Sequence, residues 1–499
     1  MEQKLERLKE ILGEVSDLRY ASALLGWDQQ TYMPPGGAEA RGNQLALLGK
    51  LAHERGTSPE LGKLLDDLKP YAASLDPDSD EARLVKVSTR TYNKATRVTT
   101  EYVMQFAQAT TLGQQAWMEA RQAKDFSIFR PHLEKIVALR QEYAAFFPDF
   151  KHPYDALLDD FEPGMKTADV KAIFDTLRPQ QVELIKAIAA KPNVDDSFLH
   201  QPFDDKKQWD FGMEVITKFG YDWSRGRQDK AAHPFTTSFS INDVRITTRV
   251  DPGFLNSMVF GTMHECGHAL YGQGAAQDLE RTGLEDGASL AIHESQSRLW
   301  ENLVGRSMPM WEHFYPRLQE VFPQLARVPL EKFYKGINKV QPSLIRVEAD
   351  EATYNLHIML RLEIEIAMVE GKVKVKDLPD LWNAKMKEYL GVIPKNVAQG
   401  VMQDIHWSGG MIGYFSTYAL GNLISAQLWE KINQEIPNLA DQVRAGKFED
   451  LLGWLRKNIH RHGAKFEPQE LVQKVTGSKI DPAAYIRYLT KKYSEIYNL

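Results

Sequence analysis

Apolar side chains recur along most of this chain at spacings of three and four residues. In the first segment, Leu5, Leu8, Ile11, Leu12 and Val15 form one apolar stripe on a helix. The same period recurs near residues 82–122, 131–147, 168–190, 344–369, 376–391 and 440–460. Turn sequences containing proline and glycine separate these segments. The pattern predicts a mainly α-helical protein.

One region departs from the helical period. Residues 235–239 and 244–250 are rich in β-branched and aromatic side chains, and residues 240–243 between them have the composition of a turn. We expect a small β-hairpin here, beside a strongly apolar helix near residues 258–270.

The organisation of the chain follows from its composition. Its 499 residues contain no internal repeat and no low-complexity linker. This favours one domain over residues 1–499, arranged as two lobes, with the helices of about residues 1–120 as a lid.

Charge and hydropathy restrict the environment of the protein. A net charge of −6 gives no basic field for nucleic acid. No apolar run approaches the ~20 residues of a membrane span, and the N-terminus is charged. The single cysteine, Cys266, excludes an internal disulfide. We therefore expect a cytoplasmic protein with neither nucleic acid nor membrane as a partner.

The apolar helix carries an H-E-x-x-H motif at residues 264–268. Positions i and i+4 share one helix face, so His264 and His268 can bind one metal ion together. Glu265 lies beside them and can accept a proton from a water whose pKa the metal lowers to ~7. Because two buried histidines and a glutamate need partners, a metal explains the motif better than structural histidines do.

A zinc site of this kind needs a third protein ligand. The downstream carboxylates are Glu280, Glu285, Asp286, Glu294 and Glu301. The first three lie in a glycine-containing stretch, whereas Glu294 lies in a mostly apolar helical segment, residues 289–300. We therefore expect Glu294 as the ligand and Glu301 as its alternative. His293 competes on the same helix but points roughly 100° away from its neighbour.

Five motifs occur along the chain. They are D-x-R-x-T at 243–247, H-E-x-x-H at 264–268, H-E-S-Q at 293–296, I-R-x-x-A-D at 345–350 and G-x-x-Q-D-x-H-W at 400–407. In these motifs, and over nearly its whole length, the chain resembles the carboxypeptidase Taq family of metallocarboxypeptidases. One position departs from the pattern, because Ser416 stands where the family often has a proline, in G-Y-F-P-T-Y.

The resemblance implies a zincin-like helical fold with a deep active-site groove, similar to angiotensin-converting enzyme and neurolysin. It implies hydrolysis of the C-terminal peptide bond of peptides with a free C-terminus, releasing single amino acids with broad specificity. It also implies a homodimer, and one divalent metal per chain held by His264, His268 and Glu294, with Glu265 as general base. Zinc is favoured, and cobalt and manganese are alternatives because the family is often active with them.

An enzyme that removes C-terminal residues must recognise a free α-carboxylate, which the planar guanidinium of arginine can bind in two places. The motifs offer Arg346 and Arg245, of which we prefer Arg346. The alternative for Arg346 is an i,i+4 pair with Asp350 at the start of a helix. Arg245 lies on the predicted hairpin, where an extended substrate can pair with a strand edge. Its alternative is a strand arginine that faces solvent.

Negative charge develops on the substrate oxygen during hydrolysis, and donors aimed at it accelerate the reaction. His406 and Tyr414, on either side of a Gly-Gly turn, are the candidate donors. We expect Gln403 and Asp404 to support this substrate-binding region by orienting His406. The alternative is a histidine and a tyrosine packed in an ordinary core.

The predicted function is thus that of a metallocarboxypeptidase. One alternative is a neurolysin-type oligoendopeptidase, which would also cut amidated peptides. A second alternative is a non-catalytic helical scaffold that binds metal. The intact Glu265 argues against the scaffold, which has no use for a base at that position.

Overall fold

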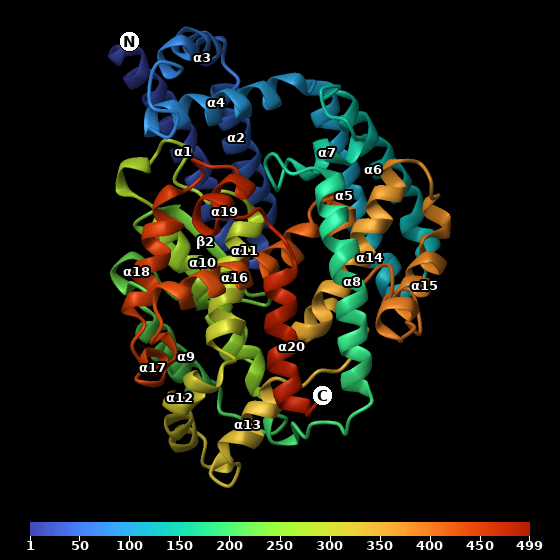
Figure 1. Ribbon diagram of the computed structural model, residues 1–499. Coiled ribbons are helices and arrows are strands. Elements are labelled where there is room, and N and C mark those ends of the chain that lie inside the picture. The colour runs from blue at the N-terminus through green and yellow to red at the C-terminus, as the bar shows by residue number, and fades with distance from the viewer. The chain divides into compact units, whose positions relative to one another are not determined.

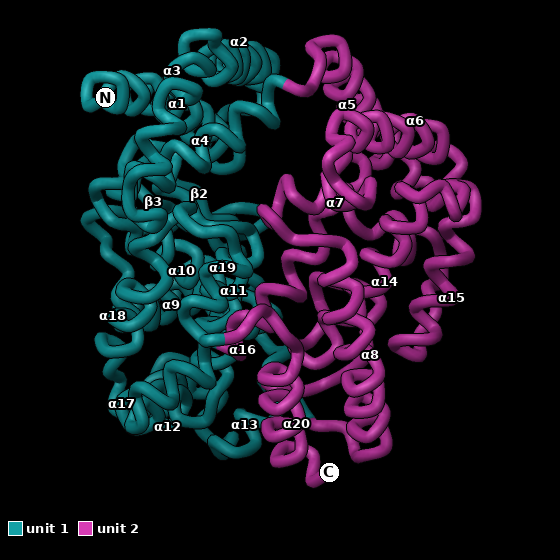
Figure 2. The backbone as a smooth tube through the Cα atoms, turned by 45° about the horizontal axis from the view of Figure 1, so that its top comes forward, with its two compact units in different colours: residues 1–96, 195–337, 428–477 teal, residues 97–194, 338–427, 478–499 magenta.

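The computed structural model describes residues 1–499, and α-helices make up most of it (Figure 1). The chain forms two units, each built from three separate segments (Figure 2). Unit 1 comprises residues 1–96, 195–337 and 428–477, and unit 2 comprises residues 97–194, 338–427 and 478–499. The predicted mainly helical fold class is confirmed.

Unit 1 is a set of helices with one small sheet. Its longer helices are α1 (Glu2–Thr31), α2 (Ala38–Gly56), α3 (Pro59–Ala72), α4 (Asp80–Arg97), α9 (Asp205–Phe219), α10 (Leu255–Gly274), α11 (Leu290–Arg298), α12 (Met308–Val321), α13 (Leu330–Ile337), α17 (Leu439–Arg444), α18 (Glu449–Asn458) and α19 (Pro468–Thr476). The predicted stripe on α1 is buried at Leu5, Leu8 and Ile11, and α1 packs against α2, α3 and the sheet.

The sheet has three strands in the order β1-β3-β2, namely β1 (Gln228–Lys230), β2 (Thr236–Ser240) and β3 (Asp243–Thr248). The antiparallel pair of β2 and β3 confirms the predicted hairpin. The short strand β1, which the sequence did not reveal, pairs with β3 in parallel. The proposed pairing of a substrate with the strand of Arg245 is therefore wrong, because β3 already has a neighbour on each side. The free edge of the hairpin belongs to β2.

Two helices of unit 1 pack unusually closely beside this sheet. α10 contacts β3, α9 and α11 and buries most of its side chains. A Cβ added at Gly267 would lie 2.6 Å from the backbone oxygen of Gln296 on α11. The helix α11 runs directly into a π-helical turn, η5 (Leu299–Val304). Such turns are rare and often mark functional sites.

Unit 2 contains the remaining long helices. They are α5 (Thr100–Ala123), α6 (Phe126–Ala145), α7 (Pro153–Leu158), α8 (Thr167–Ala189), α14 (Glu351–Val369), α15 (Leu378–Leu390) and α20 (Ala483–Tyr497), while α16 (Ser416–Glu435) contributes residues to both units. The helical segment predicted near 82–122 forms two helices, α4 and α5. The side chain of Thr99 caps the start of α5 and so separates them.

The predicted helix over 344–369 begins later than its period indicates. Arg346 lies in a short 3-10 turn, η7 (Arg346–Glu348), and Asp350 is the N-cap of α14, where it accepts the N–H groups of Ala352 and Thr353. The alternative i,i+4 pair of Arg346 and Asp350 is therefore wrong, because a capping carboxylate faces the backbone of its own helix.

Residues 1–96 belong to unit 1 and residues 97–120 to unit 2, so the segment named as a lid is divided between them. Its role as a lid stays a prediction. None of the helices combines the length and the apolar character that crossing a bilayer requires.

Candidate metal centre

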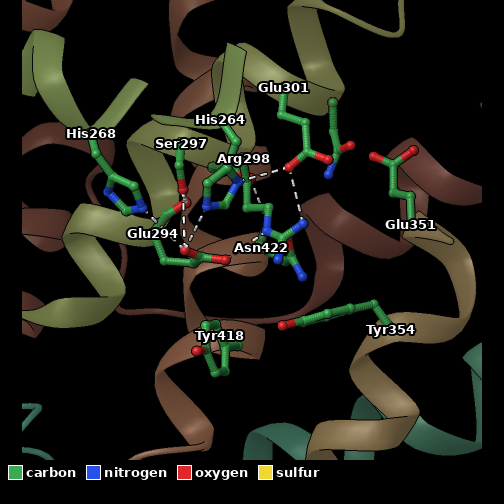
Figure 3. Close-up of polar contacts among 12 residues, drawn as sticks. His264, His268, Glu294, Ser297, Arg298, Glu301, Glu351, Tyr354, Tyr418 and Asn422 are labelled. Atoms are coloured by element: carbon green, nitrogen blue, oxygen red, sulfur yellow. Dashed lines mark hydrogen bonds and ion pairs between the residues drawn. The ribbon is translucent and has the colours of Figure 1, made fainter. Parts of the chain in front are cut away.

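Three side chains of unit 1 gather their ligand atoms in one place. His264 and His268 come from α10 and Glu294 from α11, and their ligand atoms all lie within 4.8 Å of one another. The Nε2 atoms of both histidines are 3.6 Å from Oε2 of Glu294 (Figure 3). These are the three ligands expected from the sequence.

The glycine between the two histidines permits this meeting. Any larger side chain at Gly267 would collide with the backbone of Gln296 and Ser297. The two helix backbones therefore pack in direct contact, and Glu294 lies within one turn before that contact on α11. This close approach brings its carboxylate to the histidine face of α10.

Both oxygens of Glu294 have a partner on α11 itself. Arg298 donates to Oε1 from Nε at 2.6 Å, while the Ser297 hydroxyl donates to Oε2 at 3.2 Å. Although burial opposes ionisation, Arg298 and the two histidines hold the pKa of Glu294 well below its usual range. The ligand is therefore an anion at neutral pH, and its Oε2 faces the histidines.

Glu301, the alternative third ligand in the sequence analysis, lies instead behind the ring of His264. It lies on η5, and its Oε2 is 2.8 Å from Nδ1 of His264. Arg298 donates to the same oxygen at 3.1 Å. A carboxylate at Nδ1 stabilises the tautomer that leaves Nε2 without a proton, and it also fixes the ring. Sequence reasoning named Glu301 only as an alternative ligand, and missed this supporting position.

Glu265 is buried beside the hairpin. Its Oε2 accepts the hydroxyl of Thr236, the first residue of β2, at 2.7 Å. Burial raises the pKa of Glu265, against the effects of His264 and Thr236. A carboxylate with a raised pKa is well suited to accept and then release a proton near neutral pH.

The other candidates near the motif have different partners. His293 lies 3.4 Å from Asp286 and packs against Tyr271. Glu280 accepts the backbone N–H of Ile241, which connects it to the hairpin.

Glu285 connects the same loop to α1. One of its oxygens accepts the hydroxyls of Ser16 and Tyr20, and the other accepts the backbone N–H groups of Thr282 and Gly283. With its oxygens occupied in this way, Glu285 supports the fold.

The ligand group suits a divalent metal. Burial lowers the pKa of His268 to about 4, so its imidazole is neutral at pH 7. Two imidazole nitrogens and one carboxylate are the donor set of catalytic zinc sites that keep one position open. The residues present therefore match a divalent metal in both ligand type and ligand number.

A second polar cluster lies in unit 2, around Asp404. Arg346 donates to Oδ1 of Asp404 from Nε at 3.0 Å and from Nη2 at 2.8 Å. Arg361, which the sequence did not suggest, donates to Oδ2 at 2.8 and 2.6 Å. Two buried arginines thus share one carboxylate, which leaves a positive charge in excess. An anion bound there would offset the cost of that charge.

The predicted role of Gln403 and Asp404 in orienting His406 is wrong. Oε1 of Gln403 accepts the backbone N–H of Arg346 at 2.9 Å and Nη2 of Arg361 at 2.8 Å. Asp404 binds the same two arginines. Both side chains precede His406 in sequence, but they point to the arginines. For Asp404 the reason is that charged guanidinium donors bind a carboxylate more strongly than neutral donors do.

His406 and Tyr414 do lie together, with ring centroids 5.2 Å apart. Burial lowers the pKa of His406 to about 4, so its ring is neutral at pH 7 and carries one N–H. The hydroxyl of Tyr414 is 3.2 Å from that of Tyr418. The segment therefore presents neutral donors.

Arg245 does not face solvent, so the alternative considered for it is wrong. Its guanidinium forms two hydrogen bonds of 2.8 Å with Asp243. It also lies over the rings of Trp27 and Phe239, at 4.6 and 4.8 Å from their centroids. Arg245 and Trp27 thereby connect α1 to the hairpin.

Comparison with known proteins agrees with this geometry. Residues 7–493 match the family described as carboxypeptidase Taq (M32) metallopeptidase. The thermostable carboxypeptidase 1 of Thermus thermophilus is 42% identical over 506 residues, covering 99% of each chain. Carboxypeptidase 1 of Bacillus subtilis is 38% identical over 98% of each. A crystal structure of an M32 carboxypeptidase from Deinococcus radiodurans matches with a TM-score of 0.97 and 41% identity, and all of each chain is covered.

Proposed function

The chain belongs to the carboxypeptidase Taq (M32) metallopeptidase family, and from this premise we propose how its residues carry out metal-dependent carboxypeptidase activity. His264, His268 and Glu294 hold one divalent metal, with zinc favoured over cobalt or manganese. When bound, the metal supplies a Lewis acid and lowers the pKa of a coordinated water.

Glu265 is the general base in this proposal. Thr236 lies on the edge strand β2. Its hydrogen bond to Glu265, together with the burial of Glu265, holds the carboxylate in one orientation. This carboxylate accepts the proton of the attacking water and passes it to the leaving amine, because the same group can serve as base and then as acid.

Arg346 recognises the free α-carboxylate of the peptide. Its bonds to Asp404 and to the hydroxyl of Tyr354 use three of the five guanidinium N–H groups. Two remain for a substrate, and the excess positive charge shared with Arg361 favours an anion. Arg245 has the weaker claim, because Asp243 already neutralises it.

His406 and Tyr414 donate hydrogen bonds to the oxygen on which negative charge develops. Both are neutral donors, which can bind an oxyanion without first losing a salt-bridge partner. The substrates are peptides with a free C-terminus, from which single residues are released, and the active protein is a homodimer.

The observation that carries this proposal is the ligand group of α10 and α11 with Glu265 beside it. The test compares one peptide with a free C-terminus and the same peptide amidated, using metal-loaded protein and chromatography of the products. We expect release of the last residue from the free peptide only. Glu265→Gln should retain the metal and lose at least about 100-fold in kcat, within the range typical of general-base catalysis.

Arg346→Ala should raise KM for the free peptide, with Arg245→Ala as the matched arginine control. Cleavage of the amidated peptide at an internal bond would show an oligoendopeptidase instead. Full turnover by Glu265→Gln would remove Glu265 from the role of base.

A further inference from the structure

A buried carboxylate on α14 joins three segments of unit 2. Glu365 has no exposed surface. Its Oε1 accepts the indole N–H of Trp407 at 2.7 Å. Its Oε2 accepts the hydroxyl of Tyr154 on α7 at 2.7 Å and the backbone N–H of Gly413 at 3.0 Å. A buried acid in a helix interior is costly unless its hydrogen bonds are complete, so this arrangement needs a reason beyond packing.

Two of the three donors lie in the segment that carries the candidate oxyanion donors, one near each end. Trp407 directly follows His406, and Gly413 directly precedes Tyr414. One carboxylate therefore holds the segment 406–414 near both of its ends. Between them, the backbone N–H of Met411 donates to the carbonyl of His406 at 3.0 Å, which closes the turn.

The backbone at Gly413 is shaped for this contact. Its φ of +103° lies in the region that favours glycine. A Cβ at this position would also lie 2.6 Å from the carbonyl oxygen of Leu157 on α7. The residue thus fits between α7 and α14 only as glycine, and in that position its N–H points to Glu365.

We propose that Glu365 is a positioning residue, which holds His406 and Tyr414 in place for the reaction by binding Trp407 and Gly413. This inference rests on the function proposed for His406 and Tyr414.

The ionised form accepts all three hydrogen bonds with two acceptor oxygens, whereas protonation places a donor hydrogen on one of them. Burial raises the pKa of Glu365 to about 7, while the bonds from Tyr154, Gly413 and Trp407 oppose that rise. A neutral amide of the same shape has one acceptor oxygen and one NH₂ group, so an N–H would face the N–H of either Trp407 or Gly413. Glu365→Gln should therefore release one end of the segment without creating a cavity.

The test measures kcat and KM of Glu365→Gln on a peptide with a free C-terminus, with rates expressed per bound metal. We expect kcat to fall about 10- to 100-fold, as for removal of groups that orient a reactive one, while KM and metal content stay within about threefold. Tyr154→Phe is the matched control. It removes the third donor but keeps both bonds to the segment, and kcat should stay within about threefold.

A double-mutant cycle separates positioning from general stability. If Glu365 acts through Trp407, then Trp407→Phe should lower kcat by a similar factor, and Glu365→Gln should add less than about threefold to it. The inference would be overturned if the losses in kcat of the two single variants multiplied in the double variant. A kcat of Glu365→Gln within twofold of the unchanged protein would also overturn it. Should Glu365→Gln not fold, the contrast between Trp407→Phe and Tyr154→Phe decides, since equal effects would overturn it.

The proposed function fails separately. If His406→Ala and Tyr414→Phe each leave kcat unchanged, the donor roles are wrong whatever Glu365→Gln does. If those variants are slow and Glu365→Gln is not, only the inference about Glu365 falls.

Discussion

Single side chains of the ligand group are oriented by a shared cation. Arg298 donates to Oε1 of Glu294 and to Oε2 of Glu301. Glu294 faces Nε2 of His264, and Glu301 faces Nδ1 of the same ring. Oε2 of Glu294 faces the histidines as a candidate ligand, whereas Glu301 holds the ring of a candidate ligand, His264. Their charge is offset by Arg298 and, for Glu301, by Arg306 at 3.7 Å.

Glu301 can therefore be tested as a support of the metal. Glu301→Ala removes the acceptor at Nδ1 of His264 and should weaken metal binding about 10- to 100-fold. Competition with a chelator of known affinity measures this. Glu320→Ala, which changes an exposed carboxylate of unit 1, is the control and should leave the affinity unchanged. An unchanged affinity in Glu301→Ala would mean that the ring of His264 needs no outer partner.

At the scale of elements, the distance between α10 and α11 decides whether the ligands meet. Gly267 sets that distance, since a Cβ there would lie 2.6 Å from both the backbone oxygen of Gln296 and Cα of Ser297. Close-packed backbones cannot yield as a flexible side chain can, so an added methyl group must move a helix.

Gly267→Ala should consequently lower metal content per chain and reduce Tm, because α11 and Glu294 move away from the histidines. Gly261→Ala on the same helix is a sharp control. A Cβ there meets nothing within 4 Å, and alanine favours a helix over glycine by about 1 kcal/mol. Elemental analysis and thermal unfolding of both variants measure the difference. Full metal content in Gly267→Ala would show that α10 and α11 can separate without loss of the site.

At the scale of the whole molecule, the chain passes repeatedly between its two units. Each unit draws on three separate segments, so neither corresponds to one continuous stretch of sequence. The three candidate metal ligands all come from unit 1, on the two helices α10 and α11, which follow the sheet in sequence. A metal held there stabilises the folded chain by mass action.

Removal of the metal should lower Tm. At a free metal concentration about 100 times Kd, the stabilisation is about 2.7 kcal/mol. Differential scanning calorimetry with and without a chelator measures the shift. Glu294→Ala removes a ligand, and its Tm should no longer depend on metal. An equal Tm in the loaded and stripped protein would contradict a link between the site and the stability of the fold.

The sequence by itself determined the features that depend on neighbours along the chain. The helical period of α1, α6, α8 and α15 and the hairpin of β2 and β3 follow from spacings of a few residues. The pairing of His264 with His268 likewise needs only one helical turn. The apolar period alone did not fix where helices begin. Because Asp350 caps α14, this helix starts later than the period of 344–369 indicates.

Tertiary structure alone decided which distant groups meet. The bond between His264 and Glu301 spans 37 residues, that between Arg346 and Asp404 spans 58, and that between Tyr154 and Glu365 spans 211. Residue types and spacings do not encode such contacts, because they depend on how closely whole helices pack. For the same reason, the short strand β1 and the roles of Arg361 and Gly267 became visible only in the folded protein.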